Sequence, residues 1–197
     1  MTSLIAVVGA TGKQGGSVAR SLLANTSFRV RAITRNPDSE TSQSLASLGT
    51  ELFKADGFVR KEILAAFKNV WGAFINLNSD DSIWKNDAGP TEFYLGKIII
   101  DAAAEAGVQH IVYSSGPPCT AMTNGQVSMK AMDSKRRTSR YLYGLILTIP
   151  SEVQGRAVRK AAWQISDCNA SKCRVVPGEL SNQGGCSSLR RISLFPR

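Results

Sequence analysis

Three glycines near the N-terminus carry the clearest chemical signal in the sequence. Gly9, Gly12 and Gly15 form a GxxGxxG motif directly after the apolar run Leu4–Val8 and before a segment with helical periodicity. In such a strand–turn–helix, the glycines permit a tight turn, close approach of the backbone to a pyrophosphate, and close packing of helix on strand. Free N–H groups at the helix start then hold the phosphates. The motif predicts dinucleotide binding, with a purely structural turn as the alternative.

The end of the second apolar segment indicates which dinucleotide is preferred. Sites that prefer NAD place an acid there to bind the ribose hydroxyls, whereas this chain has Thr34-Arg35-Asn36-Pro37. A guanidinium at this position pairs well with a 2′-phosphate, and Lys13 in the glycine loop is placed to help. We therefore expect NADP as the cofactor. The alternative is that Arg35 is a solvated surface charge.

Polar residues also follow the next three apolar segments. Asp56-Gly57 follows the third, where a side chain reaches an adenine ring in such folds, and Asn76–Asn78 follows the fourth, on the expected nicotinamide side. Tyr113-Ser114-Ser115 ends the fifth, at the sheet edge that binds ligands. Two alternatives remain open: Asp56 as a plain turn residue, and the two serines as caps of the following segment.

The segments that position these residues alternate between two periodicities. Short apolar or β-branched runs predict five strands, at Leu4–Val8, Arg29–Thr34, Glu51–Ala55, Gly72–Leu77 and His110–Ser114. Helical periodicity predicts the helices between them, at Gly15–Ala24, after Asn36-Pro37-Asp38, at Val59–Phe67 and at Thr91–Ala106. This alternation implies right-handed crossovers. The expected fold class is therefore α/β, a doubly wound, Rossmann-like parallel sheet of about five strands.

Charge divides the chain of 197 residues into two segments. Residues 1–133 contain 12 Lys+Arg and 12 Asp+Glu, whereas residues 134–197 contain the other 12 Lys+Arg but only 3 Asp+Glu. The whole net charge of +9 therefore lies in the second segment, where the strand–helix pattern also ends. We expect a nucleotide-binding domain over residues 1–135 and an irregular basic tail over residues 136–197.

Composition disfavours several other classes of protein. No apolar run approaches the about 20 residues of a membrane-spanning helix, and the N-terminus resembles no signal peptide, so we expect a cytoplasmic protein without membrane contact. The single His and the absence of CxxC spacing predict no metal site. Nucleic-acid binding by the tail is the least favoured function, because its basic residues lack interleaved aromatics and any recognised motif.

Taken together, the motifs resemble the NmrA-like family. GATGKQGGSVARSLL, VRAITRNP, FKADGFV, GAFINLN and AAAEAGVQHIVYSS occur in that order within residues 1 to about 135. The resemblance implies an atypical short-chain dehydrogenase/reductase with an NADP-binding Rossmann domain. It implies NADP contacts at Gly9, Ala10, Thr11, Gly12, Lys13, Gln14, Arg35, Asn36, Pro37, Asp38, Ser39, Asp56, Gly57, Leu77, Asn78, Ser79 and Lys135.

The same resemblance implies a catalytic lysine. Family members often carry a lysine soon after the fifth strand, near the nicotinamide, and Lys135 fits that place, with Lys130 as the second choice. Related reductases use such a lysine as general acid/base. The alternative is a solvated charge run, because Arg136 and Arg137 follow. No tyrosine has a lysine four residues later, so the Tyr-x-x-x-Lys pair of typical short-chain dehydrogenases is absent.

The resemblance implies two functions. We expect an NADP-dependent oxidoreductase that reduces or oxidises a small carbonyl- or enone-type metabolite in fungal specialised (secondary) metabolism. The alternative is a non-catalytic, NADP-sensing redox or transcriptional regulator, which would bind a protein partner and be placed in the nucleus.

The tail departs from the family pattern, which continues with a helix, a sixth strand and a lobe that covers the substrate. Read one nucleotide out of frame with permitted codons, the segment from Arg156 to Asn182 becomes EQYVRLLGRFLIATPANAGWFLENFL, which resembles that helix and strand. We therefore hypothesise a retained intron or a frameshift after about Lys135, which leaves the nucleotide-binding domain incomplete.

Overall fold

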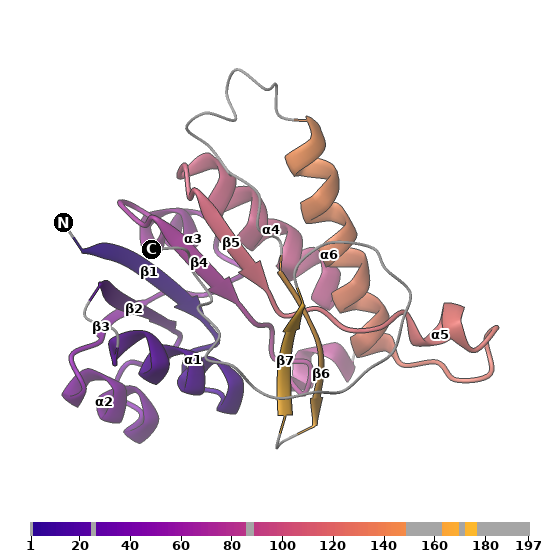
Figure 1. Ribbon diagram of the computed structural model, residues 1–197, viewed down its shortest axis with the longest axis horizontal. Helices are drawn as coiled ribbons and strands as arrows, with labels where there is room; N and C mark the ends of the chain where they lie inside the picture. The colour runs from indigo at the N-terminus through magenta and orange to yellow at the C-terminus, as the bar shows by residue number, and fades with distance from the viewer. Residues whose placement is uncertain (1, 25–26, 86–88, 149–162, 170–171, 177–197) are drawn as a thin grey trace.

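The computed structural model describes residues 2–24, 27–85, 89–148, 163–169 and 172–176. The strands are β1 (Ser3–Val8), β2 (Phe28–Thr34), β3 (Glu51–Lys54), β4 (Gly72–Ile75), β5 (His110–Tyr113), β6 (Trp163–Asn169) and β7 (Lys172–Val176). The helices are α1 (Lys13–Leu23), α2 (Glu40–Ser47), α3 (Arg60–Ala66), α4 (Glu92–Glu105), α5 (Cys119–Met122) and α6 (Lys130–Thr148), with a 3-10 turn η1 (Ser82–Lys85). These elements form a central sheet with helices on both faces (Figure 1).

The sheet has the strand order β3-β2-β1-β4-β5-β6-β7. β1 to β5 pair in parallel, so each connection between them passes over the sheet through a helix. The chain runs outward from β1 to β3 and then returns to β4 on the other side of β1, and ligands bind outside the strand ends at such a reversal. The predicted α/β class and its five parallel strands are confirmed. β6 then pairs in parallel with β5, and β7 is antiparallel to β6.

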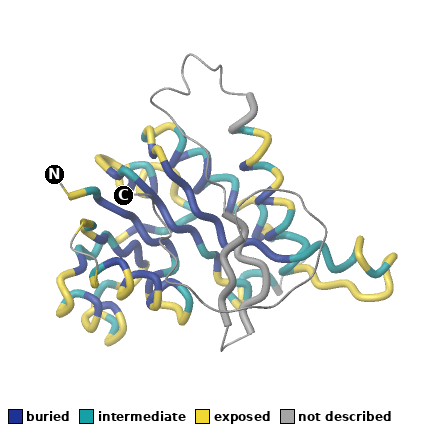
Figure 2. The backbone as a smooth tube through the Cα atoms, in the orientation of Figure 1, coloured by how far each residue is buried: buried dark blue, intermediate teal, exposed yellow. Residues whose placement is uncertain are grey.

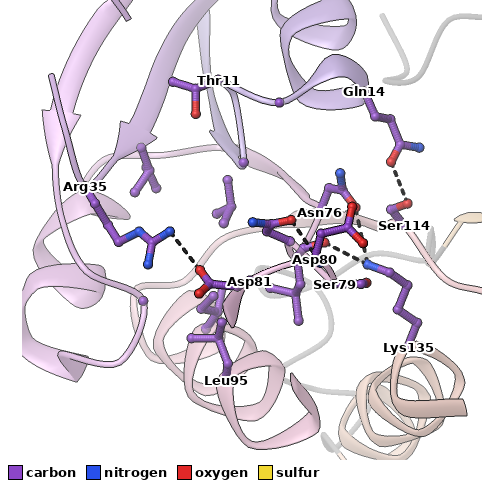
Figure 3. Close-up of a pocket in the computed structure, with 18 of the residues that line it drawn as sticks. Thr11, Gln14, Arg35, Asn76, Ser79, Asp80, Asp81, Leu95, Ser114 and Lys135 are labelled. Atoms are coloured by element: carbon purple, nitrogen blue, oxygen red, sulfur yellow. Dashed lines mark hydrogen bonds and ion pairs between the residues drawn. The ribbon is translucent and has the colours of Figure 1, made fainter. Parts of the chain in front are cut away.

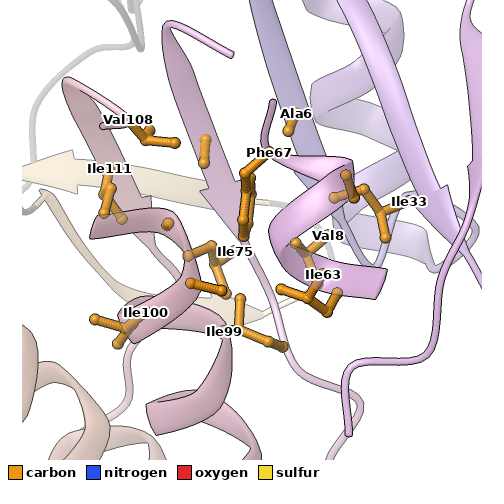
Figure 4. Close-up of a cluster of buried hydrophobic side chains, with 14 of the residues drawn as sticks. Ala6, Val8, Ile33, Ile63, Phe67, Ile75, Ile99, Ile100, Val108 and Ile111 are labelled. Atoms are coloured by element: carbon orange, nitrogen blue, oxygen red, sulfur yellow. The ribbon is translucent and has the colours of Figure 1, made fainter. Parts of the chain in front are cut away.

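Two apolar clusters hold the helices on the sheet. Alternate side chains of β1 point to opposite faces, so Ala6 and Val8 pack in the cluster with α3 and α4, whereas Val7 packs in the cluster with α1. Figure 4 shows the first cluster, in which Ile99 of α4 and Ile63 of α3 lie against the strands. β1, β4 and β5 are largely buried, whereas β3 is only partly buried and the outer helix surfaces are exposed (Figure 2). Burial on both faces explains why β1, β4 and β5 are continuous apolar runs rather than alternating ones.

α6 corrects the expected boundary of the domain. Its residues 136–148 are helical, not irregular, and the helix packs on α4. Gly96 of α4 makes the close approach possible, because a Cβ there would lie 2.5 Å from Thr138 Cγ2. Among the side chains of α6 over residues 130–145, the buried ones are mostly polar, namely Lys135, Thr138, Ser139 and Leu142. Apart from β6 and β7, which the sequence did not predict, the rest of the tail lies outside the described residues, and so does most of the segment behind the frameshift hypothesis.

Candidate nucleotide-binding site

A cavity of about 1390 Å³ lies at the carboxyl ends of β1 to β5 (Figure 3). The predicted cofactor residues that line it are Gly9, Thr11, Gly12, Lys13, Gln14, Arg35, Asn36, Ser39, Asp56, Gly57, Leu77, Asn78, Ser79 and Lys135. The structure therefore brings together residues from five separate segments of the sequence. Ala10, Pro37 and Asp38 do not line this cavity, and Ala10 is instead fully buried in the apolar cluster with α1.

The glycine loop between β1 and α1 forms one wall of the cavity. Gly9 has a φ of +77°, and a Cβ there would lie 2.4 Å from the Asn76 carbonyl oxygen. A Cβ on Gly15 would lie 2.2 Å from the Gly9 carbonyl oxygen, so both positions require glycine. α1 begins after Gly12 with no side-chain cap and no acid in its first turn. Its first N–H groups and the positive end of its dipole thus fit a pyrophosphate.

The turn after β2 is fixed by its own hydrogen bonds. The Asn36 N–H donates to Thr34 Oγ1 at 3.2 Å, and the Asp38 N–H donates to Asn36 Oδ1 at 3.1 Å. The buried Ser42 hydroxyl donates to the Asn36 carbonyl oxygen at 2.8 Å, which ties the turn to α2. These bonds hold the backbone on either side of Arg35, whose side chain points across the cavity (Figure 3).

Arg35 meets a residue that the sequence analysis did not single out. Its Nη2 donates to Asp81 Oδ2 at 2.9 Å, in the loop between β4 and η1. The Ile83 backbone N–H, and then Arg35, hold the pKa of Asp81 below its usual value, so Asp81 is a carboxylate at neutral pH. Trp84 of η1 also lines the cavity, and its Nε1 donates to the Asn78 carbonyl oxygen at 2.7 Å.

Lys135 lies at the other end of the cavity in a buried ion pair. Only 8% of Lys135 and 5% of Glu92 are exposed, and Lys135 Nζ lies 3.1 Å from Glu92 Oε1. Lys135 Nζ also donates to the Leu77 carbonyl oxygen at 2.9 Å, and the Ser79 hydroxyl donates to Glu92 Oε1 at 3.1 Å. Lys135 is therefore not a solvated surface charge. Lys130, the second choice, is exposed and does not line the cavity.

The two serines after β5 line the cavity, and Ser114 links the end of β5 to the glycine loop. The Ser114 hydroxyl donates to Gln14 Oε1 at 2.8 Å, across a sequence separation of 100 residues. Ser115 also lines the cavity, and its buried Oγ has no hydrogen-bond partner among the described residues. Both side chains therefore face the cavity. Tyr113, which precedes them, belongs instead to the apolar core, where burial raises the pKa of its hydroxyl.

Sequence and fold comparisons agree with this geometry. The NmrA-like family matches residues 1–154. The chain belongs to the NmrA-like family. It is 66% identical over 141 residues to the NmrA-like family domain-containing oxidoreductase FrzB of Cladobotryum sp., covering 72% of this chain and 42% of FrzB.

Two solved structures of the same fold contain or use a nicotinamide nucleotide. NmrA, a negative transcriptional regulator crystallised with NADP, is 28% identical with a TM-score of 0.60, over 72% of this chain and 41% of NmrA. The NADPH-dependent quinone oxidoreductase QOR2 from Escherichia coli, solved with NADPH, is 25% identical with a TM-score of 0.55, over 71% of this chain and 44% of QOR2. This NmrA-like chain thus spans less than half the length of each of these three proteins.

The described residues also limit other kinds of site. Within them, no helix has both the length and the apolar character needed to cross a membrane. The same part of the chain contains no group of three or more His, Cys, Asp or Glu residues placed to hold a metal ion. The cavity at the strand ends is thus the site from which function is best argued.

Proposed function

We propose that this NmrA-like chain is part of an NADP-dependent oxidoreductase that acts on a small carbonyl- or enone-type metabolite. The observation that carries the proposal is a single cavity with phosphate-binding features at one end and a buried lysine at the other. The name of FrzB as an oxidoreductase and the NADP in the NmrA crystals support it. The fungal source of FrzB supports a role in specialised metabolism, which we propose takes place in the cytoplasm.

The residues that line the cavity have different roles. A bound NADPH supplies a hydride, with its electron pair, to the electrophilic carbon of the substrate. The glycine loop and Arg35 hold the phosphates, and Gln14 and Ser114 border the middle of the cavity. Lys135 gives a proton from Nζ to the substrate oxygen and regains one from solvent. Glu92 holds that ammonium group beside the Leu77 carbonyl oxygen.

Turnover tests this assignment. The purified chain, and a full-length relative as a reference, are assayed for NADPH oxidation against aldehydes, enones and quinones. For any substrate that is turned over, Lys135→Met lowers kcat by at least about 100-fold while leaving the Kd for NADPH within about threefold. Unchanged kcat in the Lys135 variant contradicts the catalytic role. Absence of NADPH binding by the folded chain contradicts the whole proposal.

A second candidate is a nucleotide-sensing regulator with a protein partner. It is favoured by the likeness to NmrA, a negative transcriptional regulator. The absence of the Tyr-x-x-x-Lys pair from the sequence is compatible with both candidates. The two candidates differ in one measurable property. A regulator binds NADP without oxidising NADPH in the presence of any carbonyl compound, whereas an oxidoreductase consumes it.

A further inference from the structure

Arg35 and Asp81 join opposite walls of the nucleotide cavity. Arg35 follows β2, whereas Asp81 lies 46 residues later in the loop after β4, and their side chains meet over the cavity (Figure 3). The contact is a single one, from Nη2 to Oδ2 at 2.9 Å. Asp81 Oδ1 accepts the Ile83 backbone N–H at 3.3 Å, so the carboxylate is held by its own loop. Asp81 therefore keeps its place whether or not Arg35 stays beside it.

A 2′-phosphate and a carboxylate compete for the same guanidinium. Both are anions that bind its N–H fork, and a phosphate at Arg35 would lie within a few ångströms of Asp81. Other donors of the turn are already used: the Asp38 N–H binds Asn36 Oδ1, and the Ser42 N–H binds Ser39 Oγ. Within this turn, the phosphate thus depends on Arg35, which Asp81 partly neutralises. Lys13, which also lines the cavity, is placed to add a second positive charge.

We propose that Asp81 is a specificity-determining residue that competes with the 2′-phosphate for Arg35 and so weakens the preference for NADPH over NADH. The inference rests on the proposed nucleotide-binding function. NADH carries hydroxyls rather than a phosphate on that ribose, so its affinity does not depend on a free guanidinium. Removing the Asp81 charge therefore raises the affinity for NADPH and leaves the affinity for NADH nearly unchanged.

The test compares Asp81→Asn with the wild-type chain in fluorescence titrations with NADPH and NADH. An asparagine keeps the acceptor for the Ile83 N–H, so the loop is preserved. Because an exposed ion pair contributes up to about 1 kcal/mol, and repulsion of the phosphate adds to it, NADPH affinity rises about 3- to 10-fold. NADH affinity stays within about twofold, since no anion competes at Arg35.

Two further variants make the result specific. Asp80→Asn removes the same charge one residue away, from an exposed side chain that does not contact Arg35 in the structure, and raises NADPH affinity by less than about twofold. In an Arg35→Met background the gain in NADPH affinity from Asp81→Asn falls below about twofold, because the group for which the two anions compete is gone and only the repulsion between Asp81 and the phosphate remains.

Each remaining outcome overturns the inference. Unchanged or weaker NADPH binding by Asp81→Asn means that Asp81 positions Arg35 rather than competing for it. An equal gain in Asp80→Asn means a general charge effect. If the folded wild-type chain binds neither NADPH nor NADH, the proposed function is contradicted, and so is this inference. By contrast, if both nucleotides bind and Asp81→Asn does not change NADPH affinity, only this inference is contradicted.

Discussion

The two ends of the cavity are built in different ways. At the nucleotide end, the glycine loop and the turn after β2 are shaped by backbone geometry and by hydrogen bonds between residues at most eight positions apart. At the lysine end, the central contacts join Lys135 to Glu92 and to Leu77, from separate segments of the chain. The nucleotide end thus depends mainly on local sequence, with longer-range contacts from Gly9 to Asn76 and from Arg35 to Asp81. The lysine end depends on the packing of α6 against α4.

The outer wall beside the lysine end differs as well. Gly116, Cys119 and Met132 line the cavity there, and Met122 at the end of α5 is 70% exposed. At the nucleotide end, Val59, which follows the lining residue Phe58, is 42% exposed. The difference teaches that the glycine loop and the turn after β2 take their shape largely from residues close in sequence, whereas the lysine end relies on long-range contacts and is the more easily disrupted.

The largest expected effect comes from Glu92→Gln. It leaves the Lys135 ammonium buried without its counter-charge, which costs about 3 kcal/mol and lowers Tm by about 6–12 °C. Glu105→Gln is the matched control, because Glu105 pairs with Arg60 on the surface and contributes less than about 1 kcal/mol. Calorimetry of the two variants decides the point, and equal shifts in Tm contradict a buried, functional ion pair.

Gly15→Ala tests the nucleotide end of the cavity. Its Cβ overlaps the Gly9 carbonyl, so the loop shifts, stability falls by about 1–3 kcal/mol, and NADPH affinity falls at least about tenfold. Gly144→Ala is the control, since a Cβ there meets no atom within 4 Å and alanine favours the helix. Thermal unfolding and NADPH titration of both variants measure the effect. NADPH binding that survives Gly15→Ala unchanged would place the phosphates elsewhere.

Much of the fold was predictable because each strand is short, apolar and followed by a helix. The expected strand Arg29–Thr34 differs from the observed β2 by one residue, and Thr91–Ala106 differs from α4 by one residue at each end. α6 escaped prediction because its buried face carries Lys135, Thr138 and Ser139, so hydrophobic periodicity does not mark it.

Most of the cavity lining was predictable, whereas the binding and catalytic roles of its residues remain predictions. The glycine loop and Arg35 have local signatures, and Lys135 was found through family resemblance. Glu92 and Asp81 were missed because their significance comes from partners more than 40 residues away in sequence. Glu92 stands in the first turn of α4, where an acid is ordinary, and Asp81 lies in a polar loop. No pattern in the sequence indicates which basic side chain pairs with each of these carboxylates.

Ser114→Ala tests the coupling between the glycine loop and the end of β5. Loss of the bond from the Ser114 hydroxyl to Gln14 costs about 1 kcal/mol and loosens the contact between the glycine loop and the end of β5. Ser47→Ala removes a hydroxyl that bonds only within its own exposed helix turn, and its effect stays within about 0.5 kcal/mol. Denaturant unfolding of both variants measures the difference, and two identical curves contradict the coupling.

The smallest effect concerns the loop beside the lysine end. The Thr120 hydroxyl and backbone N–H donate to Asp133, and the hydroxyl contact most of all holds the pKa of that carboxyl below its usual value of 3.8. Because the pKa of Asp133 is lower in the folded state, its ionised carboxylate stabilises the loop above pH 3.8. This stabilisation is lost as the pH falls through the folded-state pKa of Asp133. An NMR titration of Asp133 gives a midpoint below 3.8, and Thr120→Val moves it upward. A midpoint at or above 3.8 in the unaltered chain contradicts this account.

The central claim is that the cavity at the strand ends binds NADP with its 2′-phosphate at Arg35. Parallel titrations of the unaltered chain and Arg35→Met with NADPH and NADH, read by energy transfer from tryptophan, test it directly, because Trp84 lines the cavity. The account predicts that Arg35→Met weakens NADPH binding by about tenfold or more and leaves NADH binding within about twofold. Equal loss for both nucleotides, or no loss for NADPH, would contradict it.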